Sequence, residues 1–112
     1  VGDYQQIIDQ IEEKLTNAEV IFEIPDKERR LKELESLLAD PDIWKDPLKT
    51  RELQSERSRI SGILSNWEKV SALWEDLLVL VDLAKEDEQA VAADIRETIE
   101  RLQESLGSME KA

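Results

Sequence analysis

Apolar residues recur at every seventh position between residues 47 and 85. One row consists of Leu53, Ile60, Trp67, Trp74 and Val81, and its companion row of Ile63, Val70, Leu77 and Ala84. Because two turns of an α-helix take about seven residues, each row lies along one side of a helix, whereas a β-strand would need a period of two. The repeat predicts one long helix over residues 47–85, with Trp67 and Trp74 in its packed core. Gly62 disfavours a helix interior, so we expect another helix to approach closely there.

Similar spacing marks shorter helices on both sides of the long one. Before it, the apolar positions are Tyr4, Ile8, Ile11, Leu15, Ala18 and Phe22, and they resume at Leu31, Leu34 and Leu38. Pro25 lacks an amide hydrogen and clashes with the preceding turn, so we expect separate helices over about 3–24 and 26–39. After it, the apolar positions are Val91, Ile95, Thr98 or Ile99, Leu102, Leu106 and Met109. These predict a helix over about 88–106 that stops at Gly107.

The segment from Asp40 to Pro47 has the composition of a turn, with two Asp-Pro pairs. Asp46 is placed as an N-cap, and Pro47 follows at the first helical position, where proline is tolerated best. Three carboxylates, on Asp40, Asp42 and Asp46, could also hold a hard cation. An EF-hand loop would need an oxygen ligand where Trp44 stands and a glycine where Lys45 stands, so turn formation and capping are the preferred interpretation.

Short connections between helices favour antiparallel neighbours. The sequence therefore predicts an all-α fold, an antiparallel three-helix bundle with coiled-coil-like packing, as one helical domain over residues 1–112. The last helix covers only about half of the long middle one, so a two-helix arm remains at the end near the turn. Its expected core consists of Leu31, Leu34, Leu38, Leu53 and Ile60. Such an arm cannot hide all its apolar surface and is a natural docking surface.

Composition excludes several classes of chemistry. The chain has no cysteine and no histidine, which excludes disulfides, thiolate chemistry, zinc fingers and imidazole catalysis. Its net charge of −12 has the wrong sign for generic binding to a phosphate backbone. The many acidic pairs are expected on solvated helix faces, and the longest apolar run is too short to span a membrane. We predict no enzyme activity, no catalytic, cofactor-binding or metal-binding residue, and no DNA or membrane partner.

Four residues near the turn are candidate partner contacts: Trp44, Lys49, Arg51 and Arg57. Trp44 lies off both apolar rows, so it either closes the end of the bundle or meets a partner. The basic residues belong to two clusters, Lys27, Arg29, Arg30 and Lys32, and Lys49, Arg51, Arg57 and Arg59. Glutamates are interleaved with both clusters, so pairing within each helix is the simpler interpretation. Contact with a phosphate or an acidic partner is the alternative.

Several blocks of the sequence resemble one known family. Residues 22–35 (FEIPDKERRLKELE) are similar to a stretch near the start of bacterial peptide chain release factor 2, and residues 41–47 (PDIWKDP) resemble the Pro-Asp-x-Trp-x-Asp-Pro signature that follows it. Residues 53–58 (LQSERS) and 80–88 (LVDLAKEDE) resemble later blocks. The resemblance covers about residues 3–106, and the signature around Trp44 is its most specific part.

This resemblance implies the N-terminal domain, domain 1, of a class I release factor. Such factors act in the cytoplasm in translation termination at UAA or UGA and trigger hydrolysis of peptidyl-tRNA. The family reads stop codons with Ser-Pro-Phe and hydrolyses the ester with Gly-Gly-Gln, and neither motif occurs in these 112 residues. The resemblance implies a domain that binds and positions the factor through ribosomal protein near the stalk, with interplay with the class II GTPase release factor.

The ends of the chain and its exposed apolar row lead to further expectations about chain length and oligomeric state. The chain opens on Val1 without an initiator methionine, and we expect a fragment of a longer release factor. Residues 107–112 depart from the family pattern, which leaves open how a following domain is joined. The alternative function is a free-standing acidic coiled-coil adaptor that buries its exposed apolar row by homodimerisation. Sedimentation separates these alternatives, since the adaptor would be a tight dimer.

Overall fold

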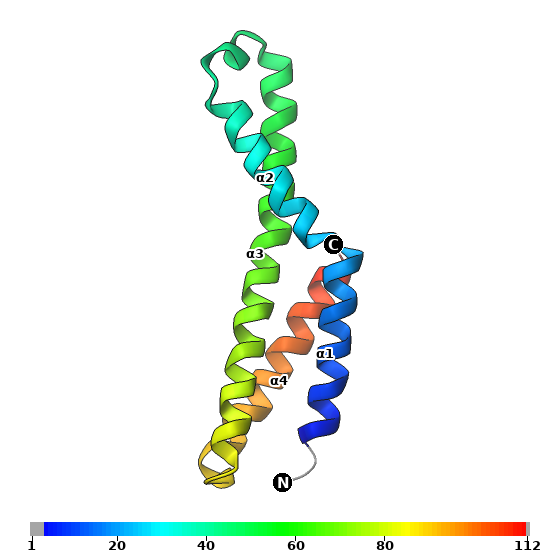
Figure 1. Cartoon of the computed structure of the whole chain (residues 1–112), viewed down its shortest axis with the longest axis vertical. Helices are drawn as coiled ribbons and strands as arrows, with labels where there is room; N and C mark the ends of the chain where they lie inside the picture. Colours follow the sequence, from blue (N-terminus) through cyan, green and yellow to red (C-terminus); the bar gives the residue numbers. More distant parts are fainter. Residues whose placement is uncertain (1–3, 112) are drawn as a thin grey trace. The chain divides into compact units, whose positions relative to one another are not determined.

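The computed structural model describes residues 4–111, and within this range it is helical without a β-strand. Four α-helices and one short 3₁₀ helix follow one another along the chain (Figure 1): α1 (Tyr4–Ile21), α2 (Ile24–Ala39), η1 (Pro41–Lys45), α3 (Pro47–Ala84) and α4 (Glu88–Lys111). The predicted all-α helical bundle is confirmed. The predicted helix start at residue 3 lies outside the described residues. None of the helices within 4–111 is long and apolar enough to cross a membrane.

The break between the first two helices precedes Pro25 and does not fall on it. α1 ends at Ile21, and α2 begins at Ile24 with Pro25 inside its first turn. Proline has no N–H to donate to the carbonyl of Ile21 four residues earlier, so α1 ends there. Glu23 makes the connection in the left-handed region, with φ of 51° and ψ of 50°. The predicted boundaries at 24 and 26 were therefore wrong by two or three residues.

Neither interior glycine plays the role expected from the sequence. α4 continues through Gly107 to Lys111, so the predicted helix end at 106 was wrong. Met109 is buried beyond the glycine and extends the apolar stripe of α4, which offsets the roughly 1 kcal/mol that glycine costs in a helix. At Gly62, an added Cβ would meet nothing within 4 Å, so no close helix contact explains this glycine.

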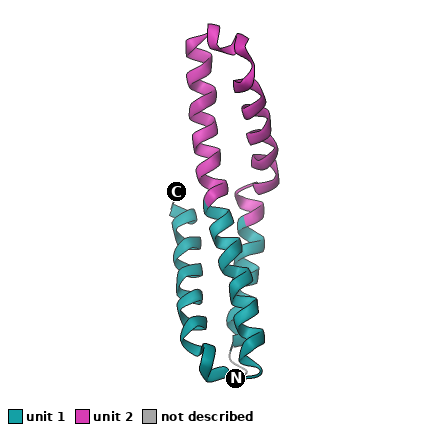
Figure 2. Cartoon of the chain, turned by 90° about the vertical axis from the view of Figure 1, so that its left-hand side faces the viewer, with its two compact units in different colours: residues 1–18, 66–112 teal, residues 19–65 magenta. Residues whose placement is uncertain are grey.

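The chain divides into two compact units, coloured separately in Figure 2. Unit 1 comprises residues 1–18 and 66–112, and unit 2 comprises residues 19–65. In unit 1, α1, the second part of α3 and α4 lie side by side, and α3 runs antiparallel to the other two (Figures 1 and 2). Its buried residues are Ile8, Ile11, Leu15, Ala18, Val70, Leu77, Ala84, Ile95, Thr98, Leu102, Leu106 and Met109. Their three- and four-residue spacing places one apolar stripe of each helix inside this unit.

Unit 2 is a two-helix arm with a small core. α2 runs antiparallel to the first part of α3, and η1 joins them (Figure 2). The core cluster consists of Leu34, Leu38, Leu53 and Ile60, with Leu31, Ile43 and Leu64 packed against it. Four of the five core residues predicted for the arm form this cluster, and the fifth, Leu31, is partly buried against it. Leu37, Trp44 and Leu48 stay exposed, so the arm leaves apolar surface uncovered, as expected for two helices.

The long helix α3 buries different rows in the two units. In unit 2, the buried residues include Leu53 and Ile60 from the first heptad row. In unit 1, they are Val70, Leu77 and Ala84 from the companion row. Trp67 and Trp74 continue the first row but are only half-buried, so the expectation that both tryptophans are core residues was wrong in part.

Candidate functional site

Two aspartates shape the turn that carries the predicted partner contacts. Asp40 ends α2, and its Oδ1 accepts a hydrogen bond from the backbone N–H of Asp42 at 3.0 Å, which begins η1. Oδ1 of Asp46 accepts a hydrogen bond from the backbone N–H of Lys49 at 3.1 Å. This is the N-cap arrangement predicted for Asp46 and Pro47. Both carboxylates are therefore used to satisfy backbone groups at helix ends.

Trp44 closes the end of α2, which is one of the two roles that the sequence left open, and its ring stays accessible. Its indole Nε1–H donates a hydrogen bond of 3.0 Å to the carbonyl oxygen of Leu38, one of the last residues of α2. The carbonyls of a final helical turn lack partners inside the helix, so the indole closes this end of α2. The residue nevertheless remains 54% exposed. A ring that is anchored at its N–H and open elsewhere can pack against a partner with little loss of side-chain entropy.

The three predicted basic contacts lie on the first half of α3 but do not form one cluster. Lys49, Arg51 and Arg57 are exposed, and none makes an ion pair among the described residues. Arg51 lines a shallow hollow of about 510 Å³ on the outer side of α3, together with Leu48, Glu52, Ser55, Glu56 and Arg59. Trp44, Lys49 and Arg57 do not line it. The structure thus brings Arg51 together with Arg59 and the exposed Leu48, and it places the other candidates elsewhere on unit 2.

Arg30 and Glu56 join the two helices of the arm in an ion pair. Nε and Nη2 of Arg30 donate to the two carboxylate oxygens of Glu56 at 2.7 and 2.8 Å, and Nη1 donates to Glu33 at 3.0 Å. A guanidinium with two parallel hydrogen bonds to one carboxylate fixes both distance and orientation. The hydrogen bonds from Arg30 lower the pKa of Glu56, and the positive charges of Arg59 and Lys49 add to this effect. The same pair raises the pKa of Arg30.

Replacing Glu56 by glutamine should destabilise the chain at neutral pH but not in acid. A carboxyl whose pKa is lowered by folding stabilises the folded state above its unfolded pKa, which is about 4.3 for glutamate. This contribution disappears as the pH falls through the lowered pKa. We therefore expect Glu56→Gln to unfold at a lower temperature than the parent at pH 7. Thermal unfolding followed by circular dichroism should show the difference closing below about pH 4.

The matched control is Glu52→Gln, one turn earlier on α3. Glu52 is exposed and makes no ion pair among residues 4–111. The variant Glu52→Gln removes the same charge but leaves the Arg30–Glu56 ion pair intact. Its unfolding temperature should therefore stay close to that of the parent at both neutral and acid pH. A gap between parent and Glu56→Gln that is equally wide at neutral and acid pH would contradict the ion-pair explanation.

The exposed groups of unit 2 are of types that can bind a partner. Among residues 4–111, no group of acidic side chains is placed to hold a metal ion. Guanidinium groups and an exposed indole on a rigid helical frame are typical of surfaces that recognise a macromolecular partner.

Sequence reasoning missed Leu48, Thr50 and the Arg30–Glu56 pair. The hydroxyl of Thr50 lies 2.8 Å from the carbonyl oxygen of Ile43 and 2.9 Å from that of Asp46, and the residue is buried. A threonine four residues after an N-cap is a usable signal, because its hydroxyl reaches the carbonyl four residues back. Intrahelical pairing was expected for both basic clusters. In the first it is seen for Arg29 with Asp26 and for Arg30 with Glu33, and among the described residues the second cluster makes no such pair. Ion pairs between two helices depend on the register of one helix against the other, and the spacing of residues along a single helix does not predict that register.

Comparison with known proteins gives a consistent result over most of the chain. The family model of the PCRF domain matches residues 27–112. Peptide chain release factor 2 of Nitratiruptor sp. is 32% identical over 109 residues, which cover 97% of this chain and 28% of that protein. The protein of the same name from Pseudothermotoga lettingae is 37% identical over 89 residues, covering 79% of this chain and 24% of that protein. Peptide chain release factor 2 of Mycobacteroides abscessus is 31% identical over 109 residues, covering 96% of this chain and 30% of that protein. The chain thus spans less than a third of the length of each of these relatives.

Proposed function

Because the chain belongs to the PCRF domain family, we propose that it is the first domain of a class I peptide chain release factor, a part that binds and positions the factor on the ribosome. The match of the family model to residues 27–112 carries this proposal. The relatives named above are all called peptide chain release factor 2, and the chain covers between 24% and 30% of each. Such coverage is what one domain of a larger factor would give.

In this proposal, the chain takes part in translation termination at UAA or UGA in the cytoplasm but is not itself the enzyme. Neither the Ser-Pro-Phe tripeptide nor the Gly-Gly-Gln motif occurs in the sequence. We therefore assign codon reading and ester hydrolysis to other parts of the factor. The partner is ribosomal protein near the stalk, with the class II GTPase release factor as a second contact.

The proposed contact surface consists of Trp44, Lys49, Arg51 and Arg57 on unit 2. The exposed indole of Trp44 supplies an apolar anchor, and large aromatic side chains often dominate binding energy at interfaces. Arg51 and Arg57 are exposed and make no ion pair among the described residues, so pairing with a partner breaks no existing pair. A net charge of −12 favours a protein contact over the phosphates of ribosomal RNA.

The double variant Trp44→Ala/Arg51→Glu tests this surface. It should weaken binding of the chain to 70S ribosomes by about tenfold or more, because an anchor and a charge pair are lost together. Binding is measured by co-sedimentation with ribosomes over a range of chain concentrations. The control variant is Arg96→Glu, an exposed arginine of α4 that makes no ion pair among residues 4–111, and its affinity should stay within about twofold.

Three outcomes of these assays would contradict the proposal. The first is the absence of any ribosome binding at micromolar concentration, and the second is an equal loss of affinity in both variants. The third is stop-codon-dependent peptide release by the chain alone. A tight dimer in sedimentation at micromolar concentration would instead support the homodimeric adaptor.

A further inference from the structure

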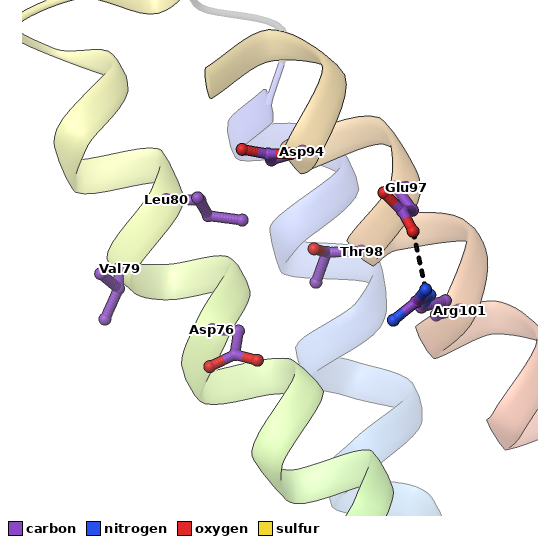
Figure 3. A pocket seen from close by; sticks show the side chains of 7 residues that line it. All are labelled: Asp76, Val79, Leu80, Asp94, Glu97, Thr98 and Arg101. Atoms are coloured by element: carbon purple, nitrogen blue, oxygen red, sulfur yellow. Dashed lines mark ion pairs between the residues drawn. The ribbon is translucent and has the colours of Figure 1, made fainter. Parts of the chain in front are cut away.

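A groove runs between α3 and α4 in unit 1, and none of the residues of the proposed ribosome contact lines it. Two hollows of about 340 and 320 Å³ lie along it, and both are lined by Arg101. Figure 3 shows the first hollow, with the side chain of Leu80 directed toward the space between the two helices. Its lining residues on α3 and α4 recur at intervals of three and four, which is the spacing of residues that share one helix face. Such a double row is the surface on which a further helix packs in a helical bundle.

The floor of this groove is partly apolar and accessible. Val79 and Leu80 line the first hollow, and Ala72 and Leu73 line the second. Val79 is 60% exposed, while Leu73 and Leu80 are half-buried. Between Lys69 and Leu80, the apolar floor runs for roughly 17 Å at 1.5 Å per residue, about three turns of a helix laid against it. A partner helix with a matching apolar stripe would bury these side chains.

The rim of the groove is acidic around the first hollow, whereas Lys69, Arg101 and Glu104 line the second. Four carboxylates and two cations line the two hollows, and Arg101 is already paired with Glu97 at 2.7 Å (Figure 3). The carboxylates of Asp76, Asp94 and Glu104 make no ion pair among the described residues. Asp76 stands on α3 and Asp94 on α4, so a helix in the groove would have negative charge on both of its sides. This arrangement selects a cationic occupant.

We propose that the α3–α4 groove of unit 1 is a docking site for a basic amphipathic helix of a partner protein, with an apolar stripe flanked by lysines or arginines. A second copy of the chain does not fit, since it would bring another net charge of −12. A nucleic acid is disfavoured for the same reason. The apolar floor sets the orientation of the helix, and the acidic rim sets its charge. This inference needs no contact with the ribosome, so it stands or falls separately from the proposed function.

The probe is a synthetic helix of about 18 residues built only from leucine, alanine and lysine. In the striped peptide, the leucines occupy one side and lysines flank them; in the scrambled peptide, the same residues are distributed around the helix. Fluorescence anisotropy should show the striped peptide binding the chain at least about tenfold more tightly than the scrambled one. Amide shifts in NMR spectra should map to residues 69–80 and 94–105.

Two double variants of equal net charge separate groove binding from general attraction. Asp76→Lys/Asp94→Lys reverses both sides of the rim, and it should weaken binding of the striped peptide by about tenfold or more. Glu75→Lys/Glu100→Lys changes exposed neighbours on the same two helices outside the hollows, and it should cost less than about threefold. Circular dichroism verifies that both variants keep the helix content of the parent.

The groove proposal is overturned by any of four results. These are absence of binding by the striped peptide, equal binding of the striped and scrambled peptides, equal losses in the two double variants, and amide shifts that map outside the groove. Because the assay contains no ribosome, failure here leaves the ribosome-binding experiment to be judged on its own.

Discussion

Leu34→Ala should open the two-helix arm while leaving unit 1 folded. Leu34 is fully buried, and only a small cluster of residues forms the core of unit 2. Truncating a buried leucine to alanine costs about 2–5 kcal/mol, because both transfer energy and cavity formation count. A core of this size has no second layer of buried side chains that could compensate for the lost packing. Hydrogen exchange at the amides of α2 should accelerate by at least about thirtyfold, while the amides of unit 1 keep their protection.

The neighbouring leucine of the same helix provides the control. Leu37 is 42% exposed, so Leu37→Ala removes the same atoms from a site that water already reaches. We expect it to cost less than about 1 kcal/mol and to leave exchange in α2 close to that of the parent. Equal acceleration in the two variants would show that helix propensity, and not the cluster, holds the arm together. Loss of protection in both units after Leu34→Ala would show that the chain unfolds as one cooperative body.

The helices and their caps are the part of this fold that local sequence predicts well. Apolar spacing located all four helices, and the Asp46-Pro47 pair located the start of α3 because capping depends on neighbours in sequence. The two errors at helix ends have different causes, one in tertiary packing and one in the local effect of a proline. Gly107 stays helical because Met109 packs beyond it. The break before α2 lies at Glu23 because the missing N–H of Pro25 acts on a carbonyl four residues back.

The candidate site was predictable in residue type but not in arrangement. The place of Trp44 off both heptad rows left its exposure open, and its hydrogen bond to Leu38 depends on the path of the turn. Lys49, Arg51 and Arg57 are close in sequence, yet only Arg51 lines the hollow on α3, because successive helical residues point about 100° apart. The Arg30–Glu56 pair joins residues 26 positions apart, so it depends on the register of α2 against α3.

The two heptad rows of α3 pose a question that sequence spacing alone leaves open, namely which row is the core. A straight helix has 3.6 residues per turn, so a strict seven-residue row turns by about 20° with each repeat. α3 also has different neighbours in the two units, α2 in one and α1 with α4 in the other. Both effects move the buried side from one row to the other along the helix. Leu77 of the companion row is therefore fully buried, whereas Trp74 of the first row is only half-buried.

Leu77→Ala should accordingly be among the most damaging single truncations in unit 1. The expected loss is about 2–5 kcal/mol in the free energy of unfolding, measured by urea denaturation. The control is the next residue, because Leu78 is 43% exposed and Leu78→Ala should cost less than about 1 kcal/mol. The pair has the same chemistry and adjacent backbone positions, so the difference isolates which side of α3 faces the core. If Leu78→Ala were the more damaging, the core of unit 1 would lie on another side of the helix, and the α3–α4 groove would lose its geometric basis.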